Sequence, residues 1–206
     1  MLAALRRSHR GAGVSALESG DFAAALAVAA SSGSREEHLA AARAGKHLLE
    51  FSQTKAILDA LLASDDTDGE AWIERGLLAA YAGDPGSAEK MLDRALMLRS
   101  DLAESITLHR AWVALESGRR ADASRLFQEV EVPLETKLRD DMGEGDPLFA
   151  EWYLHAAALW AAKGDTERSS WAGRVGTAAA GPKSRLPTRI LVDAPDGVGA
   201  DTMVRS

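Results

Sequence analysis

The sequence predicts an all-α fold, a solenoid of stacked antiparallel helix pairs followed by an extended C-terminal tail. The chain is rich in alanine and only 5% of its 206 residues are aromatic. This composition suits close-packed helices, because strands favour aromatic and β-branched side chains. One helix–turn–helix pattern also recurs five times before residue 181. Such helix pairs cannot bury their apolar faces alone, so we expect them to stack.

The clearest copy of the pattern is residues 72–100, two amphipathic segments joined by a short turn. Gly83 can adopt the left-handed conformation that ends a helix. Asp84 can cap the helix that follows, and Pro85 suits its first position. We therefore expect one helix on each side of residues 83–85.

Small residues lie where these two helices would touch, at Gly76, Ala88 and Ala95. The order Trp72-x3-Gly76-x11-Ala88-x6-Ala95 resembles the signature of the tetratricopeptide repeat (TPR) family. The resemblance extends over residues 9–180. It implies a right-handed superhelix of helix pairs whose concave wall, formed mainly by the first helix of each pair, binds a peptide or a partner helix.

Four weaker copies appear when the template is shifted by −63, −32, +35 and +81 residues. The second copy lacks a glycine in its turn. The second helix of the fifth copy is expected to be weak, because Gly173 and Gly176 each cost about 1 kcal/mol relative to alanine. In chain order, the expected turns of these copies are Gly20-Asp21, Phe51-Ser52-Gln53, Ser117-Gly118-Arg119 and Gly164-Asp165.

The expected helix starts agree with this register. Ser34 and Glu37 have the spacing of a capping box just before the second copy, and Thr67 and Glu70 have it before the third. Asp21 is expected to cap the second helix of the first copy.

The step from the fourth to the fifth copy is 46 residues, longer than the preceding 31, 32 and 35, which predicts an insertion at about 131–147. Residues 133–142 could form an extra short helix. The acidic loop 140–146 lacks EF-hand spacing, so we expect solvated charges there rather than calcium. The repeat domain then covers residues 1–180, and residues 181–206, which lack a helical period, form a flexible or extended tail.

The register also predicts which side chains line the concave groove. On the first helices of the third, fourth and fifth copies, the predicted partner-binding residues are Glu74, Leu77, Tyr81, His109, Trp112, Glu116 and His155.

Tyr81 and Trp112 would be the anchors of this groove, since aromatic residues carry much of the energy of interfaces. Ordinary packing between repeats explains the two aromatics equally well. TPR proteins that bind acidic chaperone C-termini use lysine and asparagine in the groove, and neither occurs at these positions. The wall instead suits an amphipathic helix or an apolar peptide.

A candidate chemical centre comprises His109, His155 and Glu151, because the two histidines occupy equivalent places on successive first helices. Two histidines without a third ligand at motif spacing make a weak metal site. The chain has no Gly-x-Ser-x-Gly elbow and no cysteine, which excludes thiolate catalysis. We therefore predict a protein that is not an enzyme and has no cofactor or metal.

Charge and hydropathy restrict the partners. The net charge of −7 argues against nucleic-acid binding. No run of about 18 apolar residues is present, so no membrane span is expected. The start MLAALRRSHR lacks the order of a secretory signal, which predicts a cytoplasmic protein. Export of a longer chain with a leader is the alternative.

The leading functional prediction is a non-enzymatic adaptor or scaffold that binds a partner peptide or helix in its concave groove, within a larger complex. An alternative is a structural subunit that self-associates, or belongs permanently to a multi-subunit machine, through its last repeat and tail. A metal-dependent enzyme built around His109, His155 and Glu151 is the third and weakest hypothesis.

Overall fold

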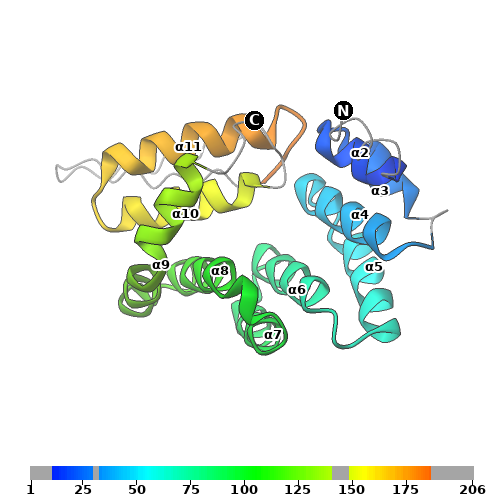
Figure 1. The fold of residues 1–206 in the computed structure, drawn as a ribbon, viewed down its shortest axis with the longest axis horizontal. Helices are drawn as coiled ribbons and strands as arrows, with labels where there is room; N and C mark the ends of the chain where they lie inside the picture. The colour runs from blue at the N-terminus through cyan, green and yellow to red at the C-terminus, as the bar shows by residue number, and fades with distance from the viewer. Residues whose placement is uncertain (1–10, 30–32, 141–148, 187–206) are drawn as a thin grey trace.

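The computed structural model describes residues 11–29, 33–140 and 149–186, and all regular structure in these ranges is helical. The predicted all-α solenoid of stacked helix pairs is confirmed (Figure 1). The helices are α2 (Ala12–Glu18), α3 (Phe22–Val28), α4 (Arg35–Leu48), α5 (Phe51–Ser64), α6 (Gly69–Tyr81), α7 (Pro85–Leu98), the 3-10 turn η1 (Ser100–Leu102), α8 (Ala103–Glu116), α9 (Arg120–Asp140), α10 (Ala150–Ala162) and α11 (Thr166–Ala180).

Consecutive helices pair, and the first helices of the pairs also pack on one another. Contacts run from α2 to α4, from α4 to α6, from α6 to α8 and from α8 to α10. The first helices thus form a continuous inner wall (Figure 1). None of the described helices is both long and apolar enough to cross a membrane.

The template pair α6 and α7 has the predicted turn chemistry. Gly83 has a φ of 84°, and the Asp84 side chain accepts a hydrogen bond of 3.0 Å from the Ser87 backbone N–H. A Cβ added at Gly76 would lie 3.0 Å from Leu92 Cγ, so glycine allows the two helices to approach closely.

The cap of α4 is confirmed, because Ser34 Oγ accepts a hydrogen bond of 3.2 Å from the Glu37 backbone N–H. The cap predicted for α6 is wrong by one residue. Asp68 rather than Thr67 accepts from the backbone of that helix, at Ala71 N–H. Thr67 is engaged instead by the Asp65 carboxylate, which accepts from both its backbone and its hydroxyl.

Asp21 precedes α3 as predicted, but its side chain makes no cap hydrogen bond. Its carboxylate lies instead 3.6 Å from Lys183 Nζ, near the other end of the chain. The turn predicted at 51–53 is also wrong, because α5 begins at Phe51. Leu49, with a φ of 59°, ends α4 in the left-handed conformation that glycine usually supplies.

The predicted extra helix at 133–142 is wrong within the described residues. Residues 133–140 are the last turns of α9, which runs through Pro133 without ending. Proline removes one helix hydrogen bond, but Leu134 and Leu138 of the same segment are buried in the core. The Tyr153 hydroxyl also donates to the Leu138 carbonyl at 2.7 Å. The rest of the predicted insertion, including the acidic loop beyond Asp140, lies outside the described residues.

The weakness predicted for α11 is not observed, since this helix is continuous from Thr166 to Ala180. A Cβ at Gly176 would lie 2.9 Å from Tyr153 Cβ and 3.0 Å from Leu154 Cγ. The glycine therefore gives α11 close contact with α10.

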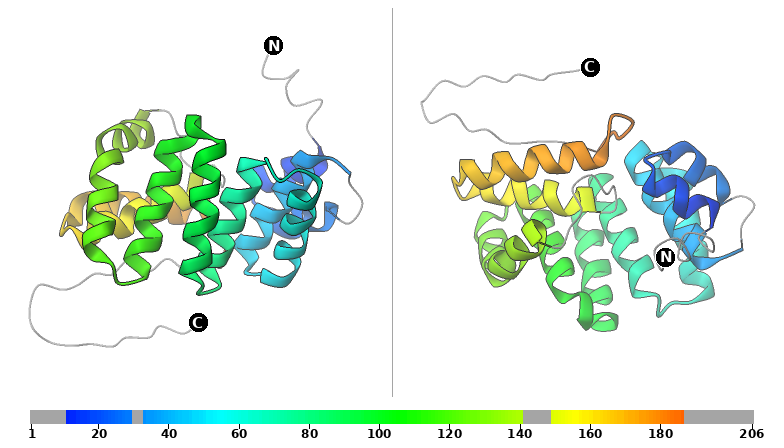
Figure 2. Two further views of the ribbon diagram at one scale, coloured as in Figure 1. Left: turned by 90° about the horizontal axis from the view of Figure 1, so that it is seen from below. Right: turned by 45° about the horizontal axis from the view of Figure 1, so that its top comes forward.

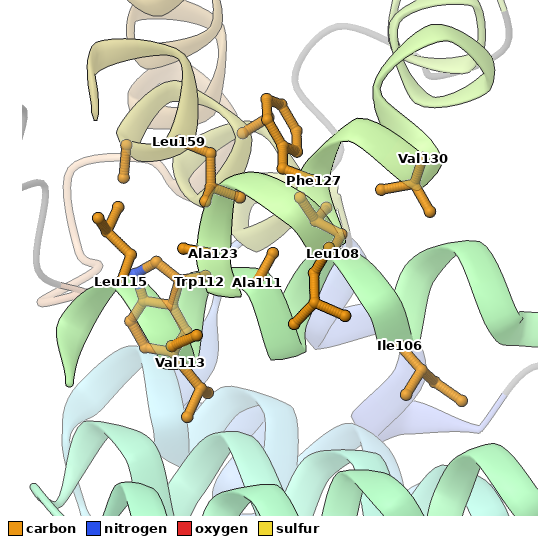
Figure 3. Packing of buried hydrophobic residues seen from close by; sticks show 14 of the residues in the cluster. Ile106, Leu108, Ala111, Trp112, Val113, Leu115, Ala123, Phe127, Val130 and Leu159 are labelled. Carbon is orange, nitrogen blue, oxygen red and sulfur yellow. The ribbon is translucent and has the colours of Figure 1, made fainter. Parts of the chain in front are cut away.

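The largest apolar core extends from α6 to α11, and Figure 3 shows part of it where α8 meets α9 and Leu159. A smaller core joins α2, α3 and α4. The two ends of the solenoid meet, as α11 runs toward α2 and α3 (Figure 2). The Arg185 backbone N–H donates to the His47 carbonyl at 2.6 Å, and His47 Nδ1 lies 2.9 Å from Ser184 Oγ.

Candidate functional site

The structure brings most of the predicted groove residues together at the centre of the inner wall. Tyr81 is half-buried, whereas Glu116 is exposed. The remaining five predicted residues are buried: Glu74, Leu77, His109, Trp112 and His155.

Sequence reasoning missed the residue at the middle of this group, Lys46 of α4. Its side chain is fully buried, and its Nζ lies 2.6 Å from Glu74 Oε2 and 2.6 Å from Glu151 Oε2. The contact with Glu151 has hydrogen-bond geometry, whereas the contact with Glu74 is an ion pair only. Arg43 Nε donates to the other Glu74 oxygen at 2.7 Å. One lysine thus joins α4, α6 and α10.

These ion pairs keep the buried groups charged. Burial alone would lower the pKa of Lys46, but the charges of Glu151 and Glu74 outweigh it and the pKa is raised. Burial would raise the pKa of Glu151, but Lys46 holds it at about 2. The pKa of Glu74 is lowered for the same reason, with Arg43 adding to the effect of Lys46.

His109 and His155 form a second buried contact, through two Nδ1 atoms 2.9 Å apart. Burial lowers the pKa of His109 to about 4 and that of His155 well below its usual value, so both rings are neutral. One ring then donates to the other. His155 Nε2 shares a hydrogen bond of 3.1 Å with the Tyr81 hydroxyl, and Trp112 stacks on His155 at 3.8 Å with an interplanar angle of 6°.

The two aromatics predicted as anchors therefore pack inside the protein, against each other and against His155. The Tyr81 and Trp112 rings are 5.1 Å apart. No group of three potential metal-ligating side chains occurs among the described residues. The set of His109, His155 and Glu151 consequently has the arrangement of a packed polar core, with Glu151 bound to Lys46 rather than open to a metal.

A cavity of ≈ 290 Å³ lies beside this polar core. Its floor is buried and includes Glu74, Leu77, Ser105, His109 and Glu151. Its mouth, which keeps partial solvent exposure, consists of Arg43, Glu70, Arg99, Leu102, Phe149 and Trp152. Leu17, His47 and Ile73 complete the lining.

The polar side of the mouth is held by ion pairs. Glu70 lies between two arginines, 2.9 Å from Arg99 Nη1 and 3.4 Å from Arg43 Nη2. The apolar side is formed by Leu102 and an aromatic pair, since Phe149 and Trp152 pack edge to face with centroids 6.1 Å apart. The mouth therefore offers both charged and aromatic contacts to a ligand.

Two buried carboxylate oxygens belong to floor residues, Glu74 Oε2 and Glu151 Oε1. Glu74 Oε2 lies 2.6 Å from Lys46 Nζ, and the Tyr81 hydroxyl interacts with the Glu151 carboxylate. Buried polar atoms without partners are uncommon in native structures. Both oxygens are sealed inside the polar core and are not exposed to the cavity.

A signal for Lys46 is present in the sequence. The shift of −32 that generates the second copy places Lys46 at the position of Leu78, which is buried in the template. A lysine at a core position predicts a buried carboxylate nearby. Sequence alone does not show that its partners are Glu74 and Glu151, because the second of these is 105 residues away.

Comparison with solved structures supports the fold. The crystal structure of MamA matches with a TM-score of 0.50 and 16% identity, covering 82% of this chain and 94% of that chain. A second MamA crystal structure has a TM-score of 0.49 and 16% identity, with coverage of 80% and 86%.

No family model and no curated protein matches the chain. At 16% identity the likeness to MamA concerns the fold alone. The chain thus has a TPR-like solenoid fold, and its similarity to the TPR family at the level of sequence remains a resemblance.

Proposed function

We propose that the chain is a non-enzymatic adaptor that binds a partner protein at the mouth of the central cavity. The observation that carries the proposal is the cavity itself, which is lined mainly by residues of the first helices and bordered by Leu102, Phe149 and Trp152. Folds of this TPR-like kind generally serve as scaffolds. Partly exposed aromatic side chains beside charged residues are typical of protein-binding sites.

The size of the cavity favours a peptide that inserts one side chain. A volume of ≈ 290 Å³ lies at the lower end of the roughly 300–1,000 Å³ typical of ligand pockets. A whole helix does not fit in this space, although a helix or an extended peptide can lie across the mouth. The predicted groove residue Glu74 would then support the floor without contacting the partner's backbone.

Substitution of Trp152 tests this proposal. The full chain would be used to capture partners from its native host, and the captured proteins would be quantified by mass spectrometry. We expect Trp152→Ala to reduce recovery of the specific partner at least tenfold, because interface aromatics dominate binding energy. Leu102→Ala, at the same mouth, should reduce it in the same direction.

Met97→Ala is the matched control, since Met97 is 72% exposed on α7 and does not line the cavity. Thermal melts of all variants verify that the fold is retained. Full recovery with both Trp152→Ala and Leu102→Ala would refute the cavity as the binding site.

The alternative, a structural subunit that self-associates through its last repeat and tail, stays a prediction. Light scattering on the purified chain separates it from the adaptor. A concentration-dependent dimer that survives Trp152→Ala would favour the alternative.

A further inference from the structure

We propose that a segment of the chain's own tail, Ile190-Leu191-Val192, inserts into the mouth of the central cavity and occupies it until a partner displaces it. The segment belongs to residues 187–206, which lie outside the described residues. The inference rests on the proposed function and adds how access to that same site is controlled. The place where the tail begins, its reach, its apolar character and its charge support it.

The last described residues of the chain lie beside the cavity. The Arg185 backbone N–H donates to the His47 carbonyl at 2.6 Å, and Ser184 Oγ lies 2.9 Å from His47 Nδ1. His47 is itself part of the cavity lining, and Leu186 is buried. The tail therefore begins at the cavity wall, held there by the hydrogen bonds to His47.

The apolar segment is within reach of the mouth. His47 and Arg43 both line the cavity, and they are four residues apart on α4, about 6 Å along the helix axis. Arg43 belongs to the mouth. The four residues 187–190 span about 13 Å when they are extended. Ile190 can therefore reach the mouth without any movement of α4.

The segment has the apolar character that the cavity requires. Residues 190–192 form the longest apolar run in residues 187–206. The apolar side chains that line the cavity are Leu17, Ile73, Leu77, Leu102, Phe149 and Trp152. A cavity of about 150 Å³ is enough to hold a benzene molecule, so a volume of ≈ 290 Å³ has room for an isoleucine or leucine side chain.

The charge of the cavity favours a neutral side chain. The ionised groups that line it are Arg43, Arg99, Glu70, Glu74 and Glu151. Lys46 lies against the last two and makes the sum three positive against three negative. A charged insert would leave a net buried charge, which is costly, whereas an aliphatic insert preserves the balance. Arg189 and Asp193, which flank the apolar run, have opposite charges and add no net charge.

The covalent link makes a weak interaction sufficient. A short linker gives an attached segment an effective concentration of about 1 mM. A segment whose free peptide binds with a Kd of about 0.1 mM would then fill the cavity in about nine of ten molecules. The apparent affinity for a partner at the same mouth would fall about tenfold, because only the open fraction can bind.

Protection of an introduced thiol tests the inference in the full chain. The chain has no cysteine, so Leu191→Cys and Val192→Cys, made separately, each supply a single reporter. We expect a maleimide to label at least one of them about tenfold more slowly than Val204→Cys, a matched valine position in the same tail, because thiol reactivity requires access. Neighbouring residues of an extended segment face opposite sides, so one protected position is sufficient. Labelling of both at the rate of Val204→Cys would overturn the inference.

Substitutions at the mouth locate the protecting surface. Trp152→Ala, and separately Leu102→Ala, should restore fast labelling of the protected thiol, whereas Met97→Ala, on an exposed position of α7, should not. Thermal melts verify that each variant is folded. Protection that survives both mouth substitutions would show that the segment docks elsewhere, which overturns its assignment to the cavity.

Competition by a free peptide provides an independent check. A fluorescently labelled peptide of residues 187–194 would be titrated into the wild-type chain and into a full chain with Ile190→Ser and Leu191→Ser. We expect about tenfold tighter binding to the variant, because its own segment no longer fills the cavity. Met203→Ser with Val204→Ser, in the same tail, should behave as the wild type. Equal affinity for the wild type and the first variant, or no binding to either, would overturn the inference.

Two further outcomes separate this inference from its alternatives. Thiol protection that disappears on dilution, together with a dimer in light scattering, would show that a second copy supplies the segment and would overturn occupation within one chain. Partner capture that depends on Trp152, with both thiols labelled fast, would leave the adaptor proposal standing and refute this inference. Protection that depends on Trp152, with partner capture that does not, would support the tail in the cavity and refute the adaptor site.

Discussion

At the scale of single residues, Lys46 has the most demanding environment in the described structure. The Lys46 side chain is completely buried, so its ammonium group has lost its hydration. The attraction of the Glu74 and Glu151 carboxylates offsets the free-energy cost of this desolvation. The two partners belong to different repeats, so the lysine stabilises the position of α4 relative to α6 and α10. Removing it would leave Glu74 and Glu151 facing each other without a cation between them.

Lys46→Met is therefore expected to lower the free energy of unfolding by about 3–5 kcal/mol, the usual cost of breaking a buried ion pair from one side. Lys55→Met is the matched control on α5. Lys55 is 55% exposed and pairs only with Asp59, so its loss should cost less than about 0.5 kcal/mol. Urea denaturation measures both values, and similar losses for the two variants would contradict the buried role of Lys46.

The buried residues around Lys46 show which features can be predicted from the sequence and which cannot. The position of Glu74 and His109 on the first helices of their repeats follows from helical period and repeat register, because both require only local geometry, whereas their burial was not predicted. The pairing of Lys46 with Glu151 depends on how strongly the solenoid curves, and this curvature is the sum of small rotations over several repeats. A local sequence pattern does not determine the total curvature, so the pairing could not be predicted.

At the scale of elements, α9 and α11 show tertiary packing overriding local propensity. Pro133 and Gly176 are both poor helix residues, yet both lie within continuous helices. Leu134 and Leu138 hold the end of α9 in the core. The helix boundaries that the sequence predicted correctly are those set by local chemistry, such as Gly83 and Asp84.

Gly176→Ala is expected to destabilise the protein by about 1–3 kcal/mol, because the added methyl would press on the Tyr153 and Leu154 side chains at 2.9–3.0 Å. Gly86→Ala offers the opposite case, since a Cβ there would meet only Asp84 Oδ1 at 3.8 Å. That change should stabilise by about 0.4–1 kcal/mol. Thermal denaturation of the two variants provides the comparison, and destabilisation by both would argue against the close contact at Gly176.

At the scale of the whole molecule, the buried groups whose pKa is lowered make the fold sensitive to acid. The pKa of His109 is about 4 in the folded state, against 6.5 for a free histidine. Between these values the unfolded chain binds a proton that the folded chain does not, so stability falls as the pH falls. The lowered pKa of Glu151, about 2 against 4.5, has the same sign over the window from pH 4.5 downward.

The free energy of unfolding is therefore expected to decrease from pH 6.5 downward, by roughly 1.4 kcal/mol per pH unit for each proton taken up on unfolding. His155, whose pKa is also lowered well below its usual value by burial, adds to the slope. Urea denaturation at pH 7, 6, 5 and 4 tests this expectation. Constant stability between pH 6.5 and pH 5 would show that the two histidines are not buried in the neutral form.

The contact between the two ends of the described solenoid has a consequence for how the protein folds. In an open repeat array every contact is local, so folding can begin in any repeat and spread, and the terminal repeats can fray independently. Here Lys46 bridges to Glu151 across 105 residues, and His47 is hydrogen-bonded to Ser184 and Arg185. Such contacts raise the contact order, which slows folding. They also tie the first repeats to the last, so we expect this short array to melt in one cooperative step.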